Sequence, residues 1–139
     1  MNIRFALLPL VPALLLLAVQ PLAASAPNFA GEYADKNFLN GQGVFQMSLE
    51  QSGSTVSVWF SAAYNDGHGC GPEATTSGKA TSKGTVEFTF HDSSRNVGTG
   101  TIVHAGNDIV VSIKTTRVAD PRCLVFYKPN MRLQRVGRK

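Results

Sequence analysis

The chain has 139 residues, of which 43% are hydrophobic and 16% are charged, with 13 glycines, two cysteines and a formal net charge of +4 at pH 7. This length allows one domain, and the composition excludes a disordered tail and a protein of long helices. It also excludes a disulfide-dense mini-protein and a multi-span membrane protein, and it favours a compact β domain.

The first 26 residues have the features of an export leader. One positive charge, Arg4, precedes an apolar run over 5–19, and the small residues at 24–26 mark a cleavage site. The run is about 15 residues long, shorter than the roughly 20 that a membrane-spanning helix needs. We therefore predict a signal peptide over 1–26, a mature domain over 27–139 with no membrane span, and a periplasmic or secreted location.

The predicted export bears on the oxidation state of the two cysteines, Cys70 and Cys123. In an oxidising compartment, two lone cysteines of a small domain usually pair. A metal site or a redox thiol is the alternative, but the chain has no Cys-x-x-Cys motif. We predict a structural disulfide between them.

Along the predicted mature chain, apolar and polar residues alternate with the period of β-strands. Phe45, Met47 and Leu49 fall on one face of a segment whose other face is polar. Turns rich in Gly, Asn, Asp and Pro separate such segments. The predicted strands cover 43–51, 55–64, 79–82, 85–91, 97–104, a segment around 109–113, 122–128 and 131–136, the last as an edge strand.

These elements predict an all-β fold, a single antiparallel meander of about seven or eight strands. Sequential hairpins close into a barrel or fold as a β-sandwich, and we favour a barrel-like meander because closure removes edge strands. Gly98 and Gly100 predict a bulge, a bend or a close backbone approach in their strand. Trp59 falls on the opposite face of its strand from Val58 and Phe60.

The segment 65–77 is predicted to be a loop, and it holds an unusual set of reactive side chains. Asp66, His68, Cys70 and Glu73 bring two carboxylates, an imidazole and a thiol within eight positions. Their spacing fits neither a zinc nor a calcium site, and a disulfide would remove Cys70 as a ligand or nucleophile. We predict a structural turn held by the bridge, with no metal.

The rest of the chain carries no catalytic signature. His91 stands beside Asp92, but the chain lacks both the Gly-x-Ser-x-Gly elbow and the Ser-x-x-Lys motif of hydrolases. No glycine-rich phosphate loop links a strand to a helix. We therefore expect a protein that is not an enzyme and that needs no cofactor.

The polar run 75–79 offers a contact for a partner protein. As a projecting loop, it would place Ser77, Gly78 and Lys79 in a partner's cleft, where Ser77 or Lys79 would bond to carboxylates. Asp66 and His68 are candidates for the same contact. The alternative is an ordinary hairpin connection.

Charge is unevenly distributed along the chain. Residues 27–113 contain four basic and eight acidic groups, whereas 114–139 contain eight basic groups and one acidic group. The basic end would suit an anionic surface, or it is a solvated edge strand and tail. Nucleic acid is not expected, because basic and aromatic residues are not interleaved. The residues that crowd the basic end are Lys128, Arg132, Arg135, Arg138 and Lys139.

The opening Phe29-Ala30-Gly31-Glu32-Tyr33, the leader, the meander and the single disulfide together resemble small periplasmic β-barrel inhibitors of the lysozyme-inhibitor type and immunity proteins against cell-wall hydrolases. Such inhibitors insert a loop with Ser-Gly and basic residues into the lysozyme cleft. The resemblance therefore implies a role for Ser77-Gly78 and Lys79. The same opening is similar to the start of lipocalin-like and avidin-like barrels, where it packs the barrel floor.

The leading hypothesis is thus an exported protein that inhibits, or gives immunity to, a cell-wall hydrolase such as a lysozyme or amidase by inserting a loop into its active-site cleft. A small-ligand-binding, lipocalin-like barrel is the first alternative, and an envelope-associated structural protein is the second. Large inward residues favour the inhibitor, because a ligand barrel needs an open cavity. Those residues are Phe45, Met47, Phe60, Phe88 and Phe90.

Overall fold

A computed structural model describes residues 17–20 and 27–137 of the chain. The signal peptide predicted over 1–26 lies outside the described residues except for 17–20, as do Arg138 and Lys139. In the described ranges, no helix is long and apolar enough to cross a membrane.

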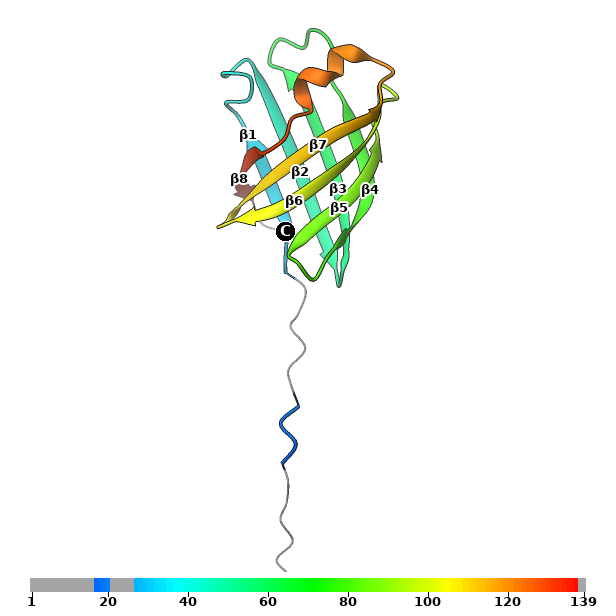
Figure 1. The fold of residues 1–139 in the computed structure, drawn as a ribbon. Coiled ribbons are helices and arrows are strands. Elements are labelled where there is room, and N and C mark those ends of the chain that lie inside the picture. Colours follow the sequence, from blue (N-terminus) through cyan, green and yellow to red (C-terminus); the bar gives the residue numbers. More distant parts are fainter. Residues whose placement is uncertain (1–16, 21–26, 138–139) are drawn as a thin grey trace, which may run out of the picture.

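Eight antiparallel strands form a closed barrel in which each strand pairs with the next along the chain and β8 pairs with β1 (Figure 1). This confirms the all-β meander and favours the barrel over the sandwich. A short 3₁₀ helix, η1, lies between β7 and β8. The elements are β1 (Gly31–Asp35), β2 (Gly43–Ser52), β3 (Thr55–Tyr64), β4 (Glu73–Ala80), β5 (Thr85–His91), β6 (Val97–Ala105), β7 (Asp108–Arg117), η1 (Pro121–Phe126) and β8 (Met131–Gly137).

The barrel has two different ends. At the turn end, the chain enters β1, and tight turns join β2 to β3, β4 to β5 and β6 to β7 (Figure 1). At the η1 end, the longer connections 36–42, 65–72, 92–96 and 118–130 gather around η1. Binding residues occur more often on loops than on strands, so the η1 end is the better candidate for a binding surface.

The structure corrects three of the predicted elements. Residues 75–79 do not form a projecting loop but lie in β4, whose alternation was hidden because its inward residues are small or polar, as Thr76 and Gly78 show. Residues 122–128 do not form a strand, because Asp120 caps η1 by accepting from the backbone N–H of Arg122, with Pro121 at the first helical position. Residues 131–137 are a strand, but not an edge strand, because β8 pairs with both β7 and β1.

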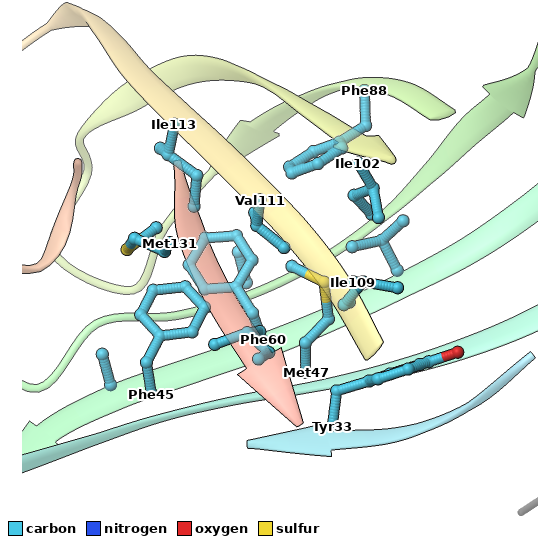
Figure 2. Close-up of a cluster of buried hydrophobic side chains, with 14 of the residues drawn as sticks. Tyr33, Phe45, Met47, Phe60, Phe88, Ile102, Ile109, Val111, Ile113 and Met131 are labelled. Carbon is cyan, nitrogen blue, oxygen red and sulfur yellow. The ribbon is translucent and has the colours of Figure 1, made fainter. Parts of the chain in front are cut away.

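Large apolar side chains fill the barrel interior (Figure 2). Phe88 packs between two inward glycines in register with it, Gly78 on β4 and Gly100 on β6. The Phe90 ring occupies the space beside Gly98 in the same way: a Cβ at Gly98 would lie 2.7 Å from two carbons of that ring. The predicted close approach at these glycines is thus confirmed, and β6 carries a register shift between Val97 and Gly98. The interior is a packed core.

The turn end is closed by an arginine from β8. The Arg135 guanidinium lies 4.9 Å from the Tyr33 ring centre, and it donates to the Tyr33 hydroxyl at 2.7 Å and to the Ala30 carbonyl at 3.0 Å. The Tyr33 hydroxyl donates in turn to the Phe29 carbonyl at 2.8 Å. His104 stacks on the Phe29 ring with centres 4.1 Å apart. These contacts join the first and last strands and seal that end of the barrel.

Candidate functional site

The loop of residues 65–70, here called the anchored loop, is exposed between two fixed ends. At its start, Asn65 donates from its side chain to the Gly41 carbonyl at 2.8 Å and from its backbone to the Gln42 carbonyl at 2.9 Å. At its end, Cys70 forms the predicted disulfide with Cys123 of η1, with Cα atoms 5.1 Å apart. Residues 65–69 between these points are all exposed.

Within the anchored loop, Asp66 and His68 are brought together. Nδ1 of His68 is hydrogen-bonded to Oδ1 of Asp66, and the backbone N–H of His68 donates to the same oxygen at 3.1 Å. The backbone hydrogen bond first, and the ring hydrogen bond second, hold the pKa of the Asp66 carboxyl below its usual value. The imidazole also stacks on Tyr64, with ring centres 4.1 Å apart. The tip of the loop therefore has a defined shape.

A buried polar cluster fixes η1 over the barrel. Asp92 accepts from the Asn96 side chain at 2.9 Å and from the Tyr127 hydroxyl at 2.6 Å. The Asn96 side-chain oxygen accepts from the backbone N–H groups of Ala119 and Asp120 at 2.8 and 2.9 Å. Burial, followed by the contact with Asp92, raises the pKa of the Tyr127 hydroxyl. Because η1 carries Cys123, this cluster also supports the anchored loop.

The predicted partner residues do not form one site. Asp66 and His68 lie in the anchored loop at the η1 end, whereas Ser77, Gly78 and Lys79 lie in the part of β4 that approaches the turn end. The latter three line a groove of about 600 Å³ on the outer wall, here called the β4–β6 groove. Its lining comprises Thr55, Ser77, Gly78, Lys79, Glu87, Phe88, Thr89, Thr99, Gly100 and Thr101.

A second hollow on the outer wall, of about 390 Å³, was missed by the sequence reasoning. The Trp59 indole forms one side, and its Nε1 donates to Oε1 of Glu73 at 2.8 Å. The available signal was the outward position of Trp59 between short neighbours. This hollow, here called the Trp59 hollow, is lined by Glu32, Ser48, Glu50, Ser57 and Trp59.

Of the five basic residues that crowd the C-terminal end, the three that the structure describes have partners within the barrel. Arg132 pairs with Asp108 at 3.1 Å, and Arg135 belongs to the seal at the turn end. The Lys128 ammonium lies 5.5 Å from the centre of the Phe38 ring. A patch for an anionic surface would have to displace these contacts.

The structure brings together one group of potential metal ligands among the residues it describes. Asp120 lies with Cys70 and Cys123, all ligand atoms within 4.8 Å of one another. The two sulfurs are bonded to each other, so neither is a thiolate, and only the Asp120 carboxylate is left. That carboxylate is itself paired with Arg122 at 2.8 Å. The geometry therefore serves the disulfide and the cap of η1.

Comparisons of this chain with protein-family models, with curated proteins and with solved structures find no match.

Proposed function

We propose that the protein is an exported, non-catalytic binding protein that inhibits, or gives immunity to, a cell-wall hydrolase, and that the anchored loop enters the enzyme's cleft. The observation that carries this proposal is an exposed loop tip between two fixed ends, Asn65 and Cys70. A loop ordered before binding loses little conformational entropy when it docks. Residues 65–69 replace residues 77–79 as the proposed contact with the enzyme, because residues 77–79 lie in β4 rather than in a loop.

The chemistry of the loop tip suits a glycosidase cleft. Muramidases and related glycosidases work with a pair of carboxyl groups flanking the scissile bond. With Nδ1 of His68 engaged by Asp66, Nε2 is the ring nitrogen left to bond a partner. It donates to a carboxylate when the imidazole is protonated and accepts from a carboxylic acid when it is neutral. Either state supplies a directional contact at the tip.

The Cys70–Cys123 disulfide supports export, because such bonds persist in oxidising compartments. A periplasmic location fits this bond and the leader predicted over 1–26. It also places the protein beside cell-wall hydrolases.

The packed interior gives a small-ligand barrel less support. Phe45, Phe60 and Phe88 are buried in the core (Figure 2), and Phe88 takes the space beside Gly100. Ligand-binding barrels keep an open apolar cavity instead. We therefore favour a partner bound on the outer surface over a small ligand bound inside the barrel.

The test is a binding and inhibition assay with the oxidised protein. It would be mixed with a panel of muramidases and peptidoglycan amidases and analysed for a 1:1 complex and for lost hydrolase activity. We expect His68→Ala to weaken inhibition at least tenfold. His91→Ala, on the outer wall of β5, is the matched control and should leave inhibition unchanged.

Two further results would separate the surfaces. Lys79→Glu should leave inhibition unchanged, because Lys79 lies on the barrel wall rather than in the anchored loop. If inhibition survives His68→Ala but is lost with Lys79→Glu, the contact lies in the β4–β6 groove instead. No complex with any enzyme of the panel would overturn the proposed function for those enzymes.

A further inference from the structure

The surroundings of Trp59 leave one side of its ring next to open space. Its in-register neighbours are Ser48 on β2 and Thr75 on β4, and Ser57 and Ser61 flank it along β3 on the same face. All four are short hydroxyl residues, and Trp59 is half-buried, so part of its indole remains accessible.

A hydrogen bond holds the ring in place. The indole Nε1 donates to Glu73, which lies on β4, while the Trp59 hollow opens over the β2 side. On that side, the Ser48 hydroxyl donates to Oε1 of Glu32 at 3.0 Å. The hollow therefore has one aromatic side, and carboxylate and hydroxyl oxygens on the others.

Hydroxyl groups continue from this hollow across the barrel wall. Ser57 of the Trp59 hollow is in register with Ser77 of the β4–β6 groove, and Thr89 is in register with Thr99 further along that groove. From β2 to β6 there are four inter-strand steps, or roughly 19 Å at 4.7–4.9 Å each. The two hollows therefore lie on neighbouring strands, and we call the outer hydroxyl groups of Ser57, Ser77, Thr89 and Thr99 the polar track.

The β4–β6 groove crosses three paired strands, over the in-register residues Gly78, Phe88 and Gly100. β4 and β5 share three register pairs, which end at Gly78 and Phe88. Beyond that point, the Thr76 hydroxyl donates to the Thr89 carbonyl at 2.7 Å, where a backbone donor would otherwise bridge the strands. The track is thus built into the strand pairing.

We propose that this track binds a linear polysaccharide of neutral or amino sugars, with one sugar ring stacked on Trp59. A sugar ring presents a face of C–H groups, which packs on the negative face of an indole, and an edge of hydroxyls, which bond carboxylates and side-chain hydroxyls. The Trp59 hollow offers the first contact, and Ser57, Ser77, Thr89 and Thr99 offer the second.

The charged side chains near Trp59 and in the β4–β6 groove favour a glycan that is not polyanionic. The Glu73 carboxylate accepts the hydrogen bond from the indole, so a polyanionic glycan would be repelled beside Trp59. In the β4–β6 groove, Lys79 and Glu87 are in register and balance one another in sign. A basic peptide would match the Glu73 carboxylate, but it would not use the hydroxyl groups of the polar track. This site is independent of the anchored loop and of the proposed inhibition.

Trp59 is the one tryptophan of the chain, so its fluorescence reports this site alone. Chitohexaose, its de-N-acetylated counterpart and cellohexaose would be titrated into the oxidised protein. We expect a saturable change in emission with at least one of them. No change with any of the three up to millimolar concentration would overturn the proposal.

Variants would then be tested by calorimetry, because Trp59→Ala removes the fluorescent probe. Trp59→Ala should lower affinity for the best oligosaccharide at least tenfold, and Thr89→Val with Thr99→Val should lower it severalfold. The matched control is Leu124→Ala, an exposed apolar residue on η1, which should bind as the parent does. Hydrolase inhibition should survive Trp59→Ala, so that the two proposals can fail separately.

Two results would refute the glycan assignment. The first is oligosaccharide binding that Trp59→Ala leaves unchanged, because the site would then lie elsewhere. The second is Trp59 quenching by oligolysine and not by any oligosaccharide, because the hollow would then be a site for a cationic partner.

Discussion

The pairing of Phe88 with Gly100 can be tested by a double-mutant cycle. A Cβ added at Gly100 would overlap Cζ, Cε1 and Cε2 of the Phe88 ring. Overpacking of this kind costs about 1–3 kcal/mol of unfolding free energy, so we expect Gly100→Ala to lose about 2 kcal/mol. Phe88→Leu removes those ring carbons and should cost about 1–2 kcal/mol by itself, because it reduces buried apolar volume.

The double variant should be less destabilised than the sum of the two single variants. With leucine at position 88, the ring atoms that a Cβ at position 100 would meet are gone, so the second substitution costs little. The coupling should then be about 2 kcal/mol, measured from urea unfolding midpoints at constant m value. Gly71→Ala is the matched control, because the nearest atom to its added Cβ is the Ala62 carbonyl oxygen at 3.8 Å. It should be neutral or stabilising by up to about 1 kcal/mol.

Losses that add to within about 0.5 kcal/mol would contradict the predicted coupling between Phe88 and Gly100. So would a Gly100→Ala variant that is no less stable than Gly71→Ala. In either case, the Phe88 ring would have room to move, and the interior would be looser than a packed core.

Three other perturbations test the ends of the barrel. Replacing Cys70 and Cys123 by serine removes a disulfide that spans a sequence separation of 53. Chain entropy predicts that this lowers the free energy of unfolding by at most about 4 kcal/mol, which urea titration would measure. Amide exchange in the anchored loop should also become faster. Arg135→Met removes the donor to Tyr33 and should lower stability by about 2 kcal/mol, whereas Arg135→Lys should retain part of it. Partial burial, and then the charge of Arg135, lower the pKa of His104, so on acidification through about pH 6.5 the unfolded chain takes up this proton before the folded chain does. Stability should therefore fall on acidification, and His104→Gln should flatten that fall in thermal melts between pH 7 and 5.

Strict alternation was sufficient to predict β2, β3 and β5, since their inward residues are large and apolar. It failed for β4, because Ala74, Thr76 and Gly78 do not stand out from the polar residues between them. Gly78 faces inward because Phe88 on the neighbouring strand occupies the space beside it. The sequence of β4 alone cannot predict this contact between strands. η1 could have been predicted from Asp120-Pro121, a capping residue followed by proline at the first helical position.

The candidate site was less accessible from sequence than the fold. The pairing of Cys70 with Cys123 followed from their number and from the predicted export. By contrast, the order of the anchored loop depends on the Gly41 carbonyl and the Tyr64 ring, contacts that the local sequence of the loop does not specify. The Trp59 hollow depends on three strands meeting in register, so its signal was spread over distant segments.

The two proposed surfaces occupy different parts of the barrel. The anchored loop stands at the η1 end, whereas the Trp59 hollow and the β4–β6 groove lie along the wall between the ends. A glycan across the strands would thus leave the loop tip uncovered, and an enzyme on the loop would leave much of the wall open. Holding a glycan would place the loop near the polymer that a cell-wall hydrolase must approach. The local concentration of inhibitor would then rise without any added contact to the enzyme, which is the advantage of joining two weak sites on one rigid body.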